Sequence, residues 1–155
     1  MSRDDLTERA QRFAQQAHEG QVRRYTGEPY VAHAERVAMA VARLTGDPEV
    51  IAAAFLHDVL EDTNTTQATL EALFGGRVAR IVVELTNVYT AERFPTINRA
   101  QRKGLERLRL ATTSEAARLI KREDVRDNLP SIERHDPQFA MHYRAEATAL
   151  MDVLA

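Results

Sequence analysis

Four ionisable side chains fall within residues 57–62, where His57, Asp58, Glu61 and Asp62 stand close together. On the helix predicted here, residues i and i+4 lie above one another, so His57 stacks with Glu61 and Asp58 with Asp62. The four then share an arc of roughly 140° at about 100° per residue. Crowded carboxylates repel unless a cation or proton intervenes, and imidazole with carboxylate oxygen suits manganese, iron, zinc or magnesium-like ions. The stretch indicates a divalent-metal site, but a solvated helix end rich in acidic residues has the same pattern.

The dipeptide His-Asp says little alone, because it occurs again as His135-Asp136. Pro137 follows this second copy, an arrangement typical of a loop histidine and an aspartate that caps a new helix. We therefore interpret the second copy as structural. Glu61 and Asp62 are what distinguish the first copy.

Two more candidate ligands lie far from this stretch. His33 stands near the start of a predicted helix, where a lone histidine is more typical of a polar core or surface position than of a ligand. Asp124 lies in a charged segment typical of a solvated helix face. In that segment Lys121, Asp124 and Asn128 share one side of the predicted helix, at i, i+3 and i+7.

Basic residues occur in two places that could serve a phosphorylated ligand. Arg23 and Arg24 occupy a glycine-containing loop just before His33, and Arg102 and Lys103 lie on a later helix. Guanidinium and ammonium groups suit phosphate. Taken individually, these residues are ordinary surface charges, and spacing alone assigns them nothing.

Composition excludes several classes of function. The chain has 155 residues, which predicts a single domain over 1–155, and its formal net charge of −2 gives no case for general nucleic-acid binding. The absence of cysteine excludes disulfides, thiolate zinc sites and a cysteine nucleophile. No apolar run is long enough to span a bilayer, and the N-terminal segment has no apolar signal region. We expect a cytoplasmic protein with no membrane partner, and leave its oligomeric state open.

Helical periodicity runs along the whole chain. The β-branched run at residues 81–83 would also suit a strand, but no partner strand is evident, so we favour a helix there. Pro130 is expected to stop the long helix that begins at Ser114. Seven or so helices with short connections predict an all-α helical bundle. The helices are expected at residues 6–17, 31–44, 48–61, 67–74, 77–88, 98–110, 114–129 and 137–154.

The ordered set of motifs resembles the hydrolase domain of the RelA/SpoT family, and especially the stand-alone small alarmone hydrolases. The similarity extends from about Ala10 to the last helix. Its most specific parts are the loop motif with His33 and the His-Asp-x-x-Glu-Asp-Thr motif. The motifs are, in order, residues 17–30, His33, residues 57–63, Glu84-Leu85-Thr86, Arg102-Lys103 and the segment from Lys121 through Asp124 to Asn128.

This resemblance implies an HD-domain fold, a divalent ion that is usually Mn²⁺, and removal of pyrophosphate from the 3′ position of guanosine tetra- or pentaphosphate. No synthetase domain is expected beside this hydrolase unit. The implied ligands are His33, His57, Asp58 and Asp124, and Glu61 and Asp62 are implied to position or activate water. The implied substrate contacts are Arg23 and Arg24 near the base, with Tyr25 able to stack on it, and Lys103, Lys121 and Asn128 near phosphates or ribose.

The sequence departs from the family pattern in two places. Arg122-Glu123 replaces a pair that is commonly Leu-Ala, and Ala34 follows His33 where proline is common. Charges at 122 and 123 could tilt the helix and move Asp124. Two alternatives to an alarmone hydrolase therefore stay open: a nucleotidase or dinucleotide phosphatase of the same HD type, and a non-enzymatic nucleotide-binding regulator with a degraded site.

Overall fold

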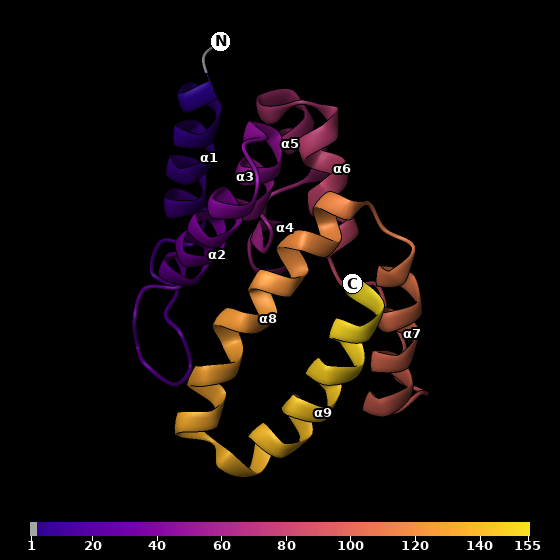
Figure 1. The fold of residues 1–155 in the computed structure, drawn as a ribbon. Helices are drawn as coiled ribbons and strands as arrows, with labels where there is room; N and C mark the ends of the chain where they lie inside the picture. The colour runs from indigo at the N-terminus through magenta and orange to yellow at the C-terminus, as the bar shows by residue number, and fades with distance from the viewer. Residues whose placement is uncertain (1–2) are drawn as a thin grey trace.

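The computed structural model describes residues 3–155, so the expectation about the N-terminal segment lies partly outside it, at Met1 and Ser2. Within the described range no strand forms, and one isolated antiparallel bridge joins Val22 to Pro29. The predicted all-α fold is confirmed (Figure 1). Nine helices make up this range: α1 Arg3–Ala17, α2 Val31–Leu44, α3 Pro48–Phe55, α4 Val59–Asp62, α5 Gln67–Phe74, α6 Gly76–Leu85, α7 Arg99–Ala111, α8 Glu115–His135 and α9 Pro137–Leu154.

Short polar residues begin several helices where the sequence places them. Asp47 accepts a hydrogen bond from the Glu49 backbone at 3.0 Å, with Pro48 as the first helical residue. Asn98 forms a capping box with Gln101 at the start of α7. Each cap satisfies backbone N–H groups that have no partner inside the helix. These caps fix where α3 and α7 start.

The main core surrounds α3, on which residues 50–55 are all buried. α1 and α2 pack against one side of α3, and α6 packs against another (Figure 1). α6 contains the β-branched run at residues 81–83, and the helix predicted there is confirmed. Its apolar residues recur at helical spacing and so form one buried face. The buried side chains of α6 are Val78, Ala79, Ile81, Val82 and Leu85.

A second layer of helices consists of α7, α8 and α9. In Figure 1, α8 crosses the molecule and α9 runs back beside it toward α7, in agreement with their packing contacts. The loop between α1 and α2 reaches down to the far end of α8, where the Tyr25 hydroxyl donates to Asp136 at 3.3 Å. α8 therefore contacts α2, α3 and α6 around the main core as well as α9 in the second layer.

The predicted end of a helix at Leu129 is wrong. α8 continues through Pro130 to His135. Its last turns are held by tertiary contacts, including the ion pair between Glu133 and Arg144 of α9. Packing against α9 thus outweighs the local cost of the proline, which removes one backbone donor.

The predicted continuous helix from Pro48 to about Glu61 is also wrong. α3 ends at Phe55, and Leu56, His57 and Asp58 form a tight turn before α4 begins at Val59. In this turn the Leu56 N–H donates to the carbonyls of Ala52 and Ala53. The stacking of His57 over Glu61 on one regular helix therefore does not apply, because the break falls at the metal-ligand candidates themselves.

Candidate metal centre

Four side chains from three parts of the chain meet at one point. A ligand atom from each of His33, His57, Asp58 and Asp124 lies within 4.8 Å of the other three. His33 comes from the first turn of α2, His57 and Asp58 from the turn between α3 and α4, and Asp124 from the middle of α8. The two histidines and Asp124 are buried, and Asp58 is partly buried.

The His57 ring is oriented by its own backbone. Nδ1 lies 2.7 Å from the Ala54 carbonyl, which can only accept, so Nδ1 carries the proton and the neutral ring leaves its lone pair on Nε2. Nε2 is buried without a hydrogen-bond partner, although oxygens of Asp58 and Asp124 lie 3.1 and 3.4 Å away. A buried polar atom without a partner calls for an explanation. A metal ion between this nitrogen and the two carboxylates would satisfy all three groups.

The His33 ring is oriented by carboxylates on both sides. Nδ1 lies 2.7 Å from Asp127 and Nε2 lies 2.8 Å from Asp124. Burial lowers the pKa of His33, but these two hydrogen bonds raise it more, so the net pKa lies above its ordinary value. Burial also opposes protonation of His57, but the nearby negative charges of Asp58 and Asp124 hold its pKa well above its ordinary value.

Both aspartates of the centre are held in the ionised form. Burial alone would raise the pKa of Asp124, but the Lys121 ammonium, which donates at 2.8 Å, and the two histidines hold it well below its usual range. Asp58 accepts from the Tyr30 hydroxyl at 2.9 Å, and its pKa is lowered to about 2, against the effect of burial, by His57. Two ionised carboxylates and two imidazole nitrogens form a donor set that suits a divalent cation.

Glu61 and Asp62 lie on α4, just after Asp58 in the chain. Both side chains reach solvent, yet partial burial raises the pKa of each, and the Asp58 charge adds to this effect. The Asn87 N–H donates to Glu61 at 2.5 Å and works against the increase. Carboxyl groups with raised pKa beside a metal centre are suited to proton transfer.

Three side chains stack where the loop between α1 and α2 meets the end of α8. The Arg24 guanidinium lies over the Tyr25 ring at 5.5 Å, and Tyr25 stacks almost parallel on His135 at a centroid distance of 5.9 Å. Arg24 is exposed, whereas the Arg23 side chain is only 12% exposed and donates to Asn128 at 3.0 Å. The two arginines therefore differ: Arg23 fastens the loop to α8, and Arg24 faces solvent.

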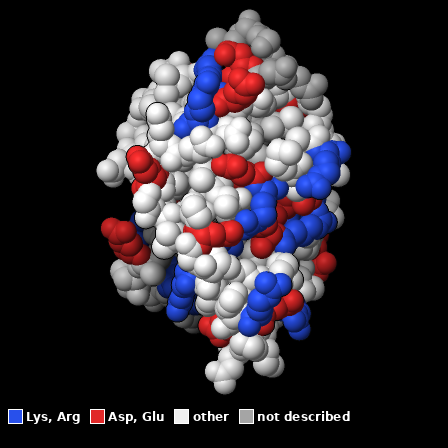
Figure 2. Space-filling view, turned by 90° about the vertical axis from the view of Figure 1, so that its left-hand side faces the viewer, with Lys and Arg blue, Asp and Glu red and all other residues white. Residues whose placement is uncertain are grey.

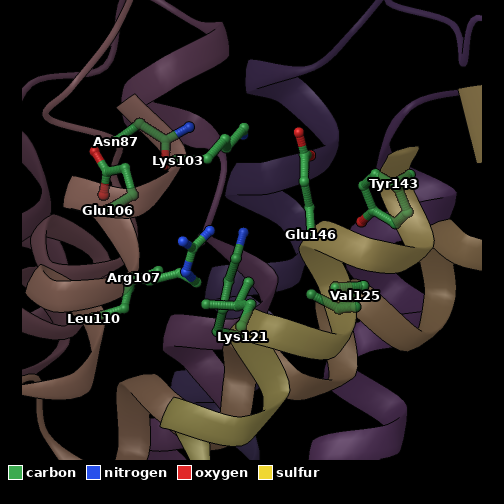
Figure 3. A pocket seen from close by; sticks show the side chains of 11 residues that line it. Asn87, Lys103, Glu106, Arg107, Leu110, Lys121, Val125, Tyr143 and Glu146 are labelled. Carbon is green, nitrogen blue, oxygen red and sulfur yellow. The ribbon is translucent and has the colours of Figure 1, made fainter. Parts of the chain in front are cut away.

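A cavity of about 100 Å³ adjoins the centre between α7, α8 and α9 (Figure 3). Lys121 connects the two, because it lines the cavity and bonds to Asp124. Burial lowers the pKa of Lys103 on the opposite wall. The lining residues are Asn87, Lys103, Glu106, Arg107, Leu110, Lys121, Val125, Tyr143, Glu146, Ala147 and Leu150.

Besides Asp127 beside His33, sequence reasoning missed three residues of this region. Tyr30 belongs to the loop motif, but only the structure shows its bond to Asp58. Tyr143 and Glu146 enter the cavity from α9, whose periodicity indicated an apolar packing face. Tyr143 and Glu146 share one side of α9, at i and i+3. A glutamate on a packing face is unusual, and this was the signal in the sequence that could have indicated a polar site there.

The charged pair Arg122-Glu123 leaves Asp124 in place. The Arg122 guanidinium donates to the Leu154 carbonyl near the end of α9, and Glu123 pairs with Arg126 on its own helix. Asp124 meanwhile keeps its bonds to His33 and Lys121. The concern that these charges would displace Asp124 is therefore not borne out by the geometry. Asp136 caps α9 as predicted, by accepting from the Phe139 N–H. The expectation of a loop histidine at 135 is wrong, because His135 is the last residue of α8.

Known proteins agree with this fold. The chain belongs to the HD domain family, which it matches over residues 10–155. It is similar to a guanosine-3′,5′-bis(diphosphate) 3′-pyrophosphohydrolase from Aquifex aeolicus, with 38% identity over 130 residues, 81% of this chain and 17% of that protein. The enzyme of the same name from Haemophilus influenzae is 39% identical over 121 residues, 77% of this chain and 18% of that protein. The chain thus spans about a fifth of the length of these curated relatives.

A solved structure is similar over most of both chains. It is described as a metazoan ortholog of SpoT that hydrolyzes ppGpp, with a TM-score of 0.82 and 30% identity over 96% of this chain and 85% of that one. A Listeria monocytogenes EGD-e protein matches with a TM-score of 0.64 and 27% identity. The expected HD fold and the resemblance to RelA/SpoT hydrolases are confirmed.

Proposed function

We propose that this chain removes pyrophosphate from the 3′ position of guanosine 3′,5′-bis(diphosphate) or the related pentaphosphate, yielding GDP or GTP. One observation carries the proposal: two imidazole nitrogens and two carboxylates meet at one buried point, and Lys121 connects that point to a basic cavity. The names of the relatives support the choice of substrate.

We assign His33, His57, Asp58 and Asp124 as ligands of one divalent ion, with Mn²⁺ as the preferred metal. The two aspartates neutralise the cation, and the imidazoles add affinity without adding charge. A bound divalent ion lowers the pKa of water and polarises a phosphoryl oxygen. The buried, unpartnered Nε2 of His57 supports this ligand set.

Glu61 and Asp62 serve as the acid–base pair. Their raised pKa values bring them nearer to neutral pH, where a carboxylate accepts a proton more readily. One of them takes the proton from water as its oxygen attacks the 3′ phosphorus. The bond from that phosphorus to the 3′ oxygen breaks, the 3′ oxygen gains a proton, and pyrophosphate leaves as one unit.

The basic residues hold the nucleotide on either side of the centre. Arg24 offers an exposed, flat cation for stacking on a purine. Tyr25, whose ring lies between Arg24 and His135, supports that cation, and Arg23 secures the loop that carries both. Lys103 and Lys121 face phosphates from the cavity, and Asn128 lies between the loop and Asp124. Fixed cations that face developing phosphate charge stabilise it without reorganisation.

No described helix is long and apolar enough to cross a membrane. The cytoplasmic location, the single domain over 1–155 and the absence of a nucleic-acid partner stay predictions. On the face shown in Figure 2, basic and acidic side chains are interspersed, and no broad patch of one sign covers it. A small nucleotide is therefore the partner that we propose.

A nucleotide panel distinguishes this function from its nearest alternative. Purified protein with Mn²⁺ should convert guanosine 3′,5′-bis(diphosphate) to GDP and pyrophosphate, resolved by anion-exchange chromatography. Release of orthophosphate from nucleoside monophosphates, with the bis(diphosphate) left intact, would instead indicate a nucleotidase of the same HD type.

A further inference from the structure

We propose that Glu28, Arg36 and Asp127 form a positioning relay that connects the nucleotide loop to the ligand His33. The inference rests on the proposed function, because it concerns how the chain aims His33 at the divalent ion. The relay residues act through His33 and the loop and are not assigned contacts with reacting atoms. Their positions follow from hydrogen bonds between the loop, α2 and α8.

Asp127 is the end of the relay that touches the ligand. Its Oδ2 lies 2.7 Å from His33 Nδ1, and Nε2 is directed toward Asp124 and Asp58. With an ion on Nε2, the ring proton would stay on Nδ1 and donate to Asp127. A carboxylate behind a metal-binding histidine fixes the tautomer and the ring orientation. Asp127 lies one helical turn after Asp124, so α8 supplies both a ligand and the group that orients another ligand.

Arg36 is the centre of the relay and lies one turn after His33 on α2. Its Nε and Nη2 donate to the two oxygens of Asp127 at 2.8 and 3.1 Å. Its Nη2 and Nη1 also donate to the two oxygens of Glu28 at 2.7 and 3.1 Å. The planar guanidinium thus fixes the rotation of both carboxylates, which a point charge would not do.

Glu28 is the end of the relay that touches the loop. Its backbone carbonyl accepts from the Arg23 N–H at 2.8 Å, beside the bridge between Val22 and Pro29. The Arg23 side chain then donates to Asn128, which itself donates to Asp124 at 3.1 Å. The loop is therefore joined to the centre by two routes, one ending at His33 and the other at Asp124.

This closed arrangement predicts coupling between loop and metal. An ion that fixes His33 also fixes Asp127, Arg36 and Glu28, and so holds the loop that presents Arg24. Coupling between two sites is reciprocal, so a nucleotide that orders the loop should tighten the metal by the same factor. Mn²⁺ alone should then slow exchange of the Arg23 and Gly27 amide protons, which donate within the loop.

The test compares Asp127→Asn and Arg36→Met with wild type and with Arg43→Met. Arg43 is a matched control, because it lies on the same helix and its guanidinium contacts the Met39 carbonyl. Titration calorimetry should show Mn²⁺ affinity weakened about 10- to 100-fold in Asp127→Asn, the usual range for such residues, and weakened less in Arg36→Met. Arg43→Met should bind Mn²⁺ as wild type does.

Two further readouts separate positioning from a merely structural effect. Proton NMR of protein loaded with diamagnetic Zn²⁺ should show a slowly exchanging His33 Nδ1–H resonance in wild type, and exchange of that proton with solvent should be faster in Asp127→Asn. Hydrogen exchange should show that Mn²⁺ protects the loop amides in wild type but not in Arg36→Met. Because Arg36 is partly exposed, that variant gives the answer even if Asp127→Asn does not fold.

The outcomes separate this inference from the proposed function. Wild-type metal affinity, His33 Nδ1–H exchange and loop protection in both folded variants would overturn the relay and leave the metal centre standing. Wild-type protein that takes up no Mn²⁺ would overturn the proposed function and the relay together.

Discussion

His57 turns its Nε2 toward two aspartates because its other nitrogen is committed to the Ala54 carbonyl. The same imidazole–carbonyl bond occupies the turn at which α3 ends, so the break in the helix and the orientation of the ring share one contact. A regular helix at this point would present His57 and Asp58 differently. At the scale of single residues, the local interruption of a helix makes the site.

We expect His57→Ala and Asp58→Ala to lose the bound ion. Each substitution removes one of four donors and, for Asp58, one of the two charges that neutralise the cation. Elemental analysis of the purified variants, with wild type loaded in parallel, measures the occupancy. Unchanged occupancy in both variants would rule out this ligand set.

Glu61→Gln and Asp62→Asn should keep the metal but lose turnover. The loss should reach about 10²-fold or more, the usual scale for general acid–base groups. Metal content is the control, because neither residue belongs to the four-donor cluster. Near-normal turnover in both variants would show that neither carboxylate transfers a proton.

The stability of the metal-free protein should fall as the pH rises. Burial opposes protonation of His33 and His57, but the neighbouring aspartates raise both pKa values above 6.5, so protonation stabilises the fold below that pH. This contribution is lost as the pH rises through the raised values. Mn²⁺ binds the neutral rings, so its affinity should increase over the same range.

Thermal unfolding with chelator and with Mn²⁺, from about pH 6 to about pH 9, measures both effects. The melting temperature of the chelated protein should fall across this range, while the increase caused by Mn²⁺ should grow. A Mn²⁺ effect that shrinks toward high pH would contradict the assignment of the histidines as ligands.

At the scale of elements, α8 is longer than the sequence pattern indicates and supplies several residues of the site. It supplies Lys121, Asp124 and Asn128 to the site, yet it contains Pro130 and extends beyond it. The proline is exposed and lies more than a turn past Asp124, so its cost falls outside the metal centre. Tertiary packing therefore overrides a local signal here.

Pro130→Ala should raise the free energy of unfolding by about 1–3 kcal/mol, since an interior proline costs a helix up to about 3 kcal/mol relative to alanine. Urea denaturation measures the change, and metal content should stay as in wild type. A loss of stability would show that the proline fits a bend that α8 requires.

The sequence predicts the regular elements well and the tertiary exceptions poorly. The bounds of α2 and the cap at Asp136 follow from periodicity and capping residues alone. The turn at Leu56 does not, because it depends on a side chain that bonds back to the chain. The passage of α8 through Pro130 does not either, because it depends on contacts with α9.

The site residues also divide into those that the sequence indicates and those that only tertiary contacts reveal. Spacing indicates the acidic stretch at 57–62, but His33 and Asp124 are ordinary residues until the family resemblance connects them. Asp127 and Tyr30 gain their meaning only from partners 94 and 28 residues away. Contacts over such separations leave no periodic signal in one sequence.

At the scale of the whole molecule, the centre exists only when the fold is complete. His33 and Asp124 are 91 residues apart and meet because α2 packs against α8, while α3 brings His57 from the core. An ion that binds this assembly but not the unfolded chain stabilises the fold by mass action. Metal uptake and global stability should therefore change together.

The central claim is that this centre splits a 3′-pyrophosphate from a guanine nucleotide. The most direct measurement is the product formed from guanosine 3′,5′-bis(diphosphate) by wild type with Mn²⁺, by wild type with chelator, and by Asp124→Asn with Mn²⁺. The account predicts GDP and pyrophosphate in equal amounts from the first, and substrate left intact by the other two. Orthophosphate as the first product, or equal turnover by Asp124→Asn, would contradict it.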